Sequence, residues 1–64
     1  MYTLQVFYAG SPTARETYQV KLAPDVLTRI PQLLEQHDGC EKVVVTLGPT
    51  RLFSVDCTGN RLPD

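Results

Sequence analysis

The sequence predicts a small α+β fold in which one helix lies between two pairs of strands, in the order ββαββ. Apolar and polar residues alternate over four stretches, at residues 2–9, 16–22, 41–47 and 51–57. Between the second and third stretches, apolar residues recur at steps of three and four instead. Side chains repeat every two residues on a strand and every 3.6 on a helix. We therefore expect one four-stranded, mostly antiparallel sheet with the helix packed on one face, all 64 residues forming a single domain.

The first two strands are predicted at residues 2–9 and 16–22. In the first strand Leu4 and Val6 alternate with polar neighbours, and the second strand repeats this pattern. The segment at 10–13 separates them and contains glycine and proline, which favour turns and interrupt a ladder of backbone hydrogen bonds. This connection is longer than a two-residue hairpin, so its turn type does not fix the register of the two strands.

The helix is predicted at residues 25–37. Asp25 is a residue type that caps a helix N-terminus, and Gly39 suits the left-handed position just after a helix ends. Pro31 disturbs the pattern, because an internal proline removes one backbone hydrogen bond. If the regular helix began near Thr28, the proline would fall in its first turn at little cost. The unbroken apolar stripe from Val26 favours a continuous helix that is bent or loosened at its start.

The third and fourth strands are predicted at 41–47 and 51–57, joined by a short turn. The remaining residues, 58–64, contain turn formers and one apolar residue, Leu62. We expect this tail to be irregular, with Leu62 packed against the sheet. The order of the strands stays open, because the helical crossover can place the third strand beside either the first or the second.

The alternation also predicts which residues face the helix. The helix-facing residues are expected to be Leu4, Val6, Tyr18, Val20, Val43, Val45, Phe53 and Val55. The opposite, open face is expected to be polar, built from Thr3, Gln5, Thr17, Gln19, Lys21, Lys42, Thr46, Ser54 and Asp56. Phe7, Val44 and Leu52 break this expectation. If they lie together they form an apolar island, and such uncovered patches mark interaction sites.

The chain is therefore predicted to be a small protein–protein interaction or regulatory module without catalytic activity. It would bind a partner protein or a second copy of itself through the open sheet face or through an edge strand. Size supports this interpretation, because 64 residues lie near the lower limit at which one core stabilises a fold without further help.

The alternative is a sheet that binds single-stranded nucleic acid. Phe7 would stack on a base, and Lys21, Lys42 and Arg51 would contact phosphates. The support is thin, because one aromatic residue and a net charge of −1 do not make the basic surface that such proteins use.

Few residues offer other chemistry. His37 and Cys40 are close in sequence, but the negative end of the helix dipole between them would disfavour a thiolate. A zinc site would have to use these two residues and Cys57, without any CxxC pair. We therefore predict no enzyme, metal, cofactor or small-molecule substrate. Without a secretory signal or an apolar span we expect a cytoplasmic protein without membrane contact, whose two cysteines are reduced, buried hydrophobes.

Overall fold

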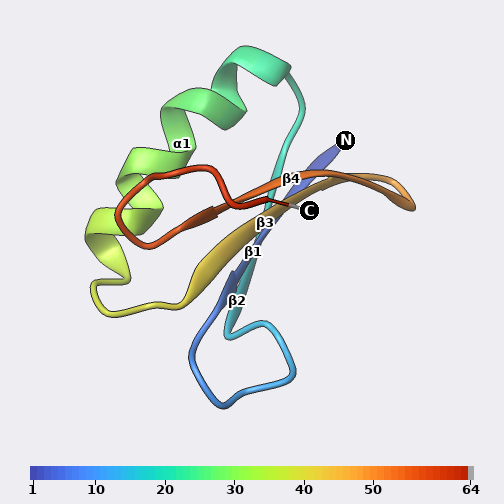
Figure 1. The fold of residues 1–64 in the computed structure, drawn as a ribbon. Helices are drawn as coiled ribbons and strands as arrows, with labels where there is room; N and C mark the ends of the chain where they lie inside the picture. Colours follow the sequence, from blue (N-terminus) through green and yellow to red (C-terminus); the bar gives the residue numbers. More distant parts are fainter. Residues whose placement is uncertain (64) are drawn as a thin grey trace.

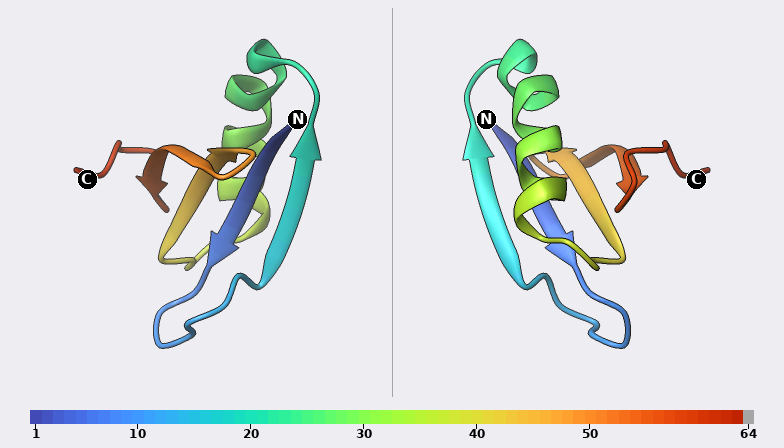
Figure 2. Two further views of the ribbon diagram at one scale, coloured as in Figure 1. Left: turned by 90° about the vertical axis from the view of Figure 1, so that its right-hand side faces the viewer. Right: turned by 90° about the vertical axis from the view of Figure 1, so that its left-hand side faces the viewer.

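A computed structural model describes residues 1–63 and confirms the α+β class and the ββαββ order (Figure 1). The elements are β1 (Tyr2–Phe7), β2 (Glu16–Val20), α1 (Ala23–Gln36), β3 (Lys42–Leu47) and β4 (Thr50–Asp56). The helix lies across one face of the sheet, and the other face carries no helix (Figure 2).

The strands are arranged in the order β2-β1-β3-β4, and every neighbouring pair is antiparallel. This arrangement answers the question that the sequence left open, because β3 lies beside β1 and not beside β2. β2 and β3 therefore run in the same direction on either side of β1, and α1 crosses over the sheet to join them. As a result, the start of α1 lies at the end of the sheet where β1 begins.

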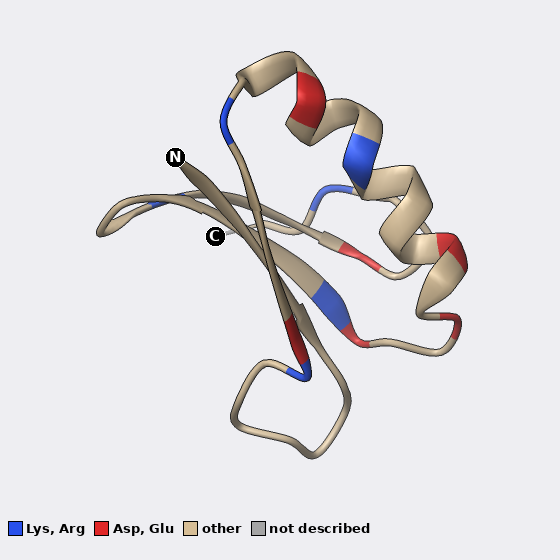
Figure 3. Cartoon of the chain, turned by 180° about the vertical axis from the view of Figure 1, so that it is seen from behind, with Lys and Arg blue, Asp and Glu red and all other residues tan. Residues whose placement is uncertain are grey.

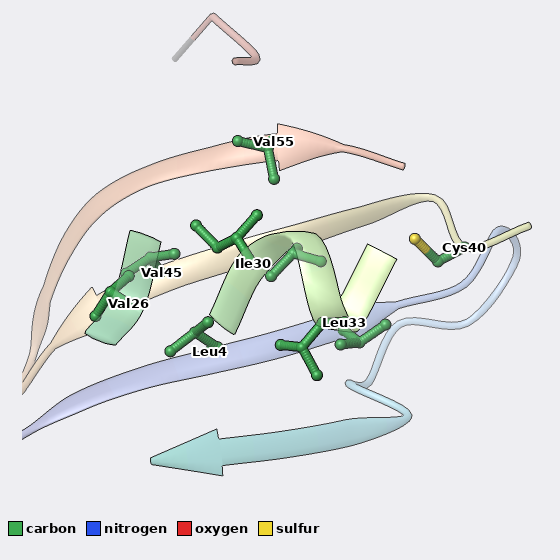
Figure 4. Close-up of a cluster of buried hydrophobic side chains, with 9 residues drawn as sticks. Leu4, Val26, Ile30, Leu33, Cys40, Val45 and Val55 are labelled. Carbon is green, nitrogen blue, oxygen red and sulfur yellow. The ribbon is translucent and has the colours of Figure 1, made fainter. Parts of the chain in front are cut away.

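The strand register places the predicted apolar residues on the helix side of the sheet. Leu4 lies opposite Val45, and Val43 lies between Val6 and Val55 on the neighbouring strands. The buried cluster consists of Leu4, Val6, Val26, Ile30, Leu33, Cys40, Val43, Val45 and Val55. Figure 4 shows this cluster running from Val26 and Val45 at one end to Cys40 at the other. The sequence predicted this face of the sheet correctly.

The helix begins two residues before the predicted start. Leu22 is the N-cap residue, no side chain caps the first turn, and Asp25 lies inside that turn. The expectation that Asp25 caps the helix is therefore wrong, because Pro24 takes the first-turn position to which proline is suited. Pro31 lies within a continuous helix, as the unbroken stripe indicated. Gly39 follows the helix with φ +88°, the left-handed conformation expected there.

The C-terminal tail pairs with the outer edge of β4 rather than running free. The backbone N–H of Asp56 donates to the carbonyl of Asn60 (2.8 Å), and that of Leu62 donates to Ser54 (2.9 Å). Val55 also forms an isolated bridge with Arg61. Leu62 is half-buried, which agrees with its expected packing against the sheet. Among residues 1–63, β2 is therefore the edge strand without a neighbour on its outer side.

Among residues 1–63, α1 is the single helix, and it is too short and too polar to cross a lipid bilayer.

Candidate binding surface

Two of the three residues expected in an apolar island do share the open face. Phe7 lies opposite Lys42 and Val44 lies opposite Gln5, so the two apolar residues are diagonal neighbours across β1 and β3. Neither is a free apolar surface. Val44 is only 8% exposed, and the ammonium group of Lys42 lies 5.4 Å from the centre of the Phe7 ring.

Leu52 does not join them, and the predicted island of three residues is therefore wrong. The register of β3 and β4 shifts at Val45/Thr46, where Val45 lies opposite Phe53 and Thr46 lies opposite Arg51. Leu52 is the extra residue of this β-bulge, which interrupts the alternation of faces. Its side chain packs against the helix-side core instead of the open face.

The three cations of the predicted nucleic-acid surface lie on separate elements. Lys42 contacts Phe7 near the middle of the sheet, whereas Lys21 follows β2 at one edge. Arg51 lies on β4 at the other edge, where its guanidinium donates to the hydroxyl of Ser54 (3.0 Å). The half-buried ring of Phe7 and these cations do not form a continuous track along which a nucleic-acid strand could run.

A different apolar surface lies where β1 begins and the helix starts; we call it the apolar end. Four large hydrophobic residues are exposed at this end: Met1 (58%), Leu22 (62%), Leu27 (67%) and Leu47 (39%). The topology gathers them, because Tyr2 lies between Val20 and Leu47 in the sheet, and β2 leads through Leu22 directly into α1. Exposed apolar residues that cluster in this way mark interaction sites.

An open cavity of about 450 Å³ lies within the apolar end. It is lined by Tyr2, Ala23, Pro24, Val26, Leu27, Val45, Leu52 and Phe53. The hydroxyl of Tyr2 is the single polar side-chain group in this lining. The β-bulge contributes directly, because it turns Leu52 and Phe53 toward the same space. The volume of the cavity falls within the usual range for pockets that hold small organic groups, roughly 300–1,000 Å³.

Charged residues of both signs are adjacent to the residues that line the cavity. The guanidinium of Arg61 lies 5.1 Å from the centre of the ring of Phe53, which lines the cavity. Asp25 lies in the first turn of α1, between the lining residues Pro24 and Val26. Elsewhere the two signs are interspersed along the chain (Figure 3).

The opposite end of the molecule is held together by a disulfide, and we call it the disulfide end. Cys40, just before β3, is bonded to Cys57, just after β4, with 5.5 Å between their Cα atoms. The expectation of two reduced cysteines is therefore wrong. It rested on an assumed compartment, whereas the pairing depends on two strand ends that the β3–β4 hairpin brings into register. The Cys57 sulfur also lies 3.3 Å from the carbonyl oxygen of His37. Because a disulfide sulfur carries no hydrogen, this is a van der Waals contact and not a hydrogen bond.

A polar cluster lies beside the disulfide. The hydroxyl of Tyr8 lies 3.0 Å from Nδ1 of His37, and the hydroxyl of Tyr18 lies 3.2 Å from Nε2. A hydroxyl both donates and accepts, so the two bonds are satisfied with either imidazole tautomer. Arg15 and Arg29 lie over the two tyrosine rings, at 4.3 and 5.1 Å from the ring centres.

These contacts also occupy the residues that could have served as metal ligands or as a nucleophile. The sulfurs of Cys40 and Cys57 are bonded to each other, and both ring nitrogens of His37 bind tyrosine hydroxyls. The sequence did not predict this cluster. One signal was available in the sequence. Tyr18 falls on the helix-facing side of β2, Tyr8 directly follows β1, and His37 is the residue at which the helix ends.

No protein-family model, curated protein or solved structure that was compared with this chain matches it. The inference about function therefore depends on the surface itself.

Proposed function

We propose that this chain is a non-catalytic protein-interaction module whose binding surface is the apolar end. The observation that carries this proposal is an open cavity with an apolar lining that includes the exposed Leu27, at the end of the sheet where Leu22 and Leu47 are also exposed. Water contacts these side chains in the free protein, and a partner that covers them gains roughly 25 cal/mol per Å² of apolar surface removed from water.

The proposal moves the binding surface from the open sheet face to the end of the sheet. The open face supports it less well, because Val44 is nearly buried and Lys42 lies against Phe7. The free edge of β2 is a second place where a partner strand would add to the sheet. The apolar end is favoured over this edge because it offers both protruding side chains and a hollow, the shape typical of binding hot spots.

Selection from a random-peptide library would test the proposal. We expect the wild-type protein to enrich peptides that carry a large apolar residue, with affinities measured by fluorescence anisotropy. Leu27→Asp should weaken these affinities by about 30-fold or more, the loss seen when a central apolar anchor is removed. Because Leu27 is 67% exposed, this substitution should leave the fold intact, as circular dichroism would verify.

Gln32→Asp is the matched control, because it adds the same charge to an exposed position of α1 outside the cavity lining. It should change peptide affinity by less than about twofold. If no selected peptide depends on Leu27, or if both substitutions act equally, the proposed function is wrong.

The cytoplasmic location stays a prediction. The disulfide weighs against it, because thiols in that compartment are kept reduced, whereas disulfides persist in oxidising compartments.

A further inference from the structure

We propose that the C-terminal tail is a displaceable strand, which occupies the place beside β4 where β2 of a second copy of this chain fits. Once the tail leaves β4, copies of the chain join head to tail through their sheets. This inference goes beyond the proposed function and does not depend on Leu27, the residue whose substitution tests that function.

The tail is attached to β4 by few contacts. Among residues 1–63, a single bridge between Val55 and Arg61 joins the tail to this strand, whereas β1 and β2 are paired over five residues each. Arg61 and Pro63 are exposed, and Leu62 between them is half-buried. Segments with few buried contacts open more readily than the core of a fold. A longer strand that pairs with more of β4 therefore competes well with the tail.

The directions of the two edge strands suit head-to-tail pairing. The sheet has four strands and every neighbouring pair is antiparallel, so β2 and β4 run in opposite directions. A second copy in the same orientation, placed beside β4, presents its β2 antiparallel to β4. The tail also runs antiparallel to β4, so β2 of the copy takes the same direction in the same place. Figure 2 shows β2 and the tail at opposite edges of the sheet.

The side chains of the two edges match on each face. A copy in the same orientation keeps its helix on the same side of the sheet, so Tyr18 and Val20 of β2 meet apolar residues of β4, which are Phe53 and Val55. The guanidinium of Arg61, 5.1 Å from the centre of the Phe53 ring, leaves with the tail and frees this ring for apolar contact. On the other face polar residues meet polar residues, namely Thr17 and Gln19 of β2 with Ser54 and Asp56 of β4.

Pairing of two identical edges is less favourable. If two β2 strands paired over all five residues, Arg15 of one copy would lie opposite Lys21 of the other, and like charges at such positions are destabilising. Pairing of β4 with β4 would require both copies to release their tails. The head-to-tail contact requires only one released tail for each contact, and it repeats from copy to copy because it joins two different surfaces.

Proline substitution in the tail tests the inference. Leu62→Pro removes the backbone N–H that donates to Ser54, whereas the matched control Leu62→Ala keeps it. We expect light scattering to give the monomer mass of 7.2 kDa for the wild type and for Leu62→Ala. At the same concentration Leu62→Pro should give masses above twice that value. Adding Leu27→Asp to Leu62→Pro should leave these masses unchanged, which separates this association from the apolar end.

A second pair of variants identifies β2 as the partner strand. Thr17→Lys/Gln19→Lys, added to Leu62→Pro, places two lysines at exposed positions of β2, where lysines block strand addition. This variant should return to the monomer mass. Thr28→Lys/Gln32→Lys adds the same charge at exposed positions of α1 and should leave the larger masses of Leu62→Pro unchanged.

Hydrogen exchange in the wild type tests the displaceable tail even if Leu62→Pro does not fold. The amide of Leu62 should exchange at least about 100-fold faster than that of Val45, which lies in β3 between two neighbouring strands. Equal protection of these two amides, or a folded Leu62→Pro that stays monomeric, would overturn the inference. Masses limited to twice the monomer, or masses that the β2 lysines leave unchanged, would assign the association to another pair of surfaces and refute the head-to-tail contact. Larger masses that Leu27→Asp abolishes would refute it as well, and would identify a second copy as the partner of the apolar end.

Discussion

The two ends of the helix α1 are fixed to the sheet in different ways. Its C-terminal end is held in place by the buried Leu33, by a histidine that is hydrogen-bonded to two tyrosines, and by a disulfide just after the helix. At its N-terminal end no side chain caps the helix, and Leu22 and Leu27 remain exposed beside a cavity. One end therefore provides stability, whereas the other keeps its apolar surface available. A chain of 64 residues benefits from this division, because its core alone supplies little excess stability.

Leucine truncation at the two ends should give the largest contrast. Leu33→Ala removes a side chain that is fully buried, so we expect a loss of about 3 kcal/mol in the free energy of unfolding, from lost burial and the cavity left behind. Leu27→Ala should change it by less than about 0.5 kcal/mol, because this side chain is mostly exposed. Urea unfolding measures both values. Equal losses would show that the N-terminal end of the helix is packed as firmly as the other.

Removing the disulfide should affect stability but not binding. The crosslink joins residues that are 17 positions apart, and its loss in the Cys40→Ala/Cys57→Ala variant should cost about 3 kcal/mol by the loop-entropy relation. The selected peptides should still bind within about twofold at a temperature where the variant is folded. A much larger loss of affinity would mean that the two ends are coupled through the helix.

A smaller effect is expected from the tyrosine hydroxyls. Tyr18→Phe removes one bond to His37 and should cost about 1 kcal/mol of unfolding free energy. Tyr2→Phe is the control at the apolar end, where the hydroxyl makes no hydrogen bond with any described residue, and should cost less than about 0.5 kcal/mol. Thermal unfolding of the two variants side by side would measure this difference. If both variants lost the same free energy of unfolding, the hydrogen bonds between His37 and the tyrosines would contribute no net stability.

The smallest effect concerns Asp56, at the disulfide end. The hydrogen bond from the side chain of Thr58, together with bonds from the backbone N–H groups of Asn60 and Thr58, lowers the pKa of this carboxyl below its ordinary value of 3.8. A carboxyl whose pKa is lower in the folded state stabilises the fold above its unfolded pKa, and that contribution is lost as the pH falls through the folded pKa.

An NMR titration of the Asp56 carboxyl carbon should therefore give a midpoint below 3.8 in the folded protein. Asp56→Asn should remove the corresponding part of the acid-induced loss of stability. A midpoint at or above the ordinary value would show that the Asp56–Asn60 turn does not hold in solution.

The sequence predicted the elements and the core because both depend on periodicity. Val43, Val45 and Val55 fall on the helix-facing side whatever the order of the strands. It did not predict where Leu52 points, because a β-bulge without glycine leaves no mark in the pattern. The apolar end was missed for the same kind of reason. Leu22 precedes α1, Leu27 lies within α1 and Leu47 ends β3, and only the topology brings these three segments to the same end of the sheet.

The pairing of the tail with β4 affects how copies of this chain could assemble. A sheet with two free margins can be extended by further copies from both sides, and such growth has no natural end. Here the backbone groups of Ser54 and Asp56 are already hydrogen-bonded to the tail, so that among residues 1–63 β2 is the strand whose whole outer edge is free. Strand addition at β2 is therefore not matched by an equally open edge at β4, and this difference disfavours the growth of filaments from both sides of the sheet.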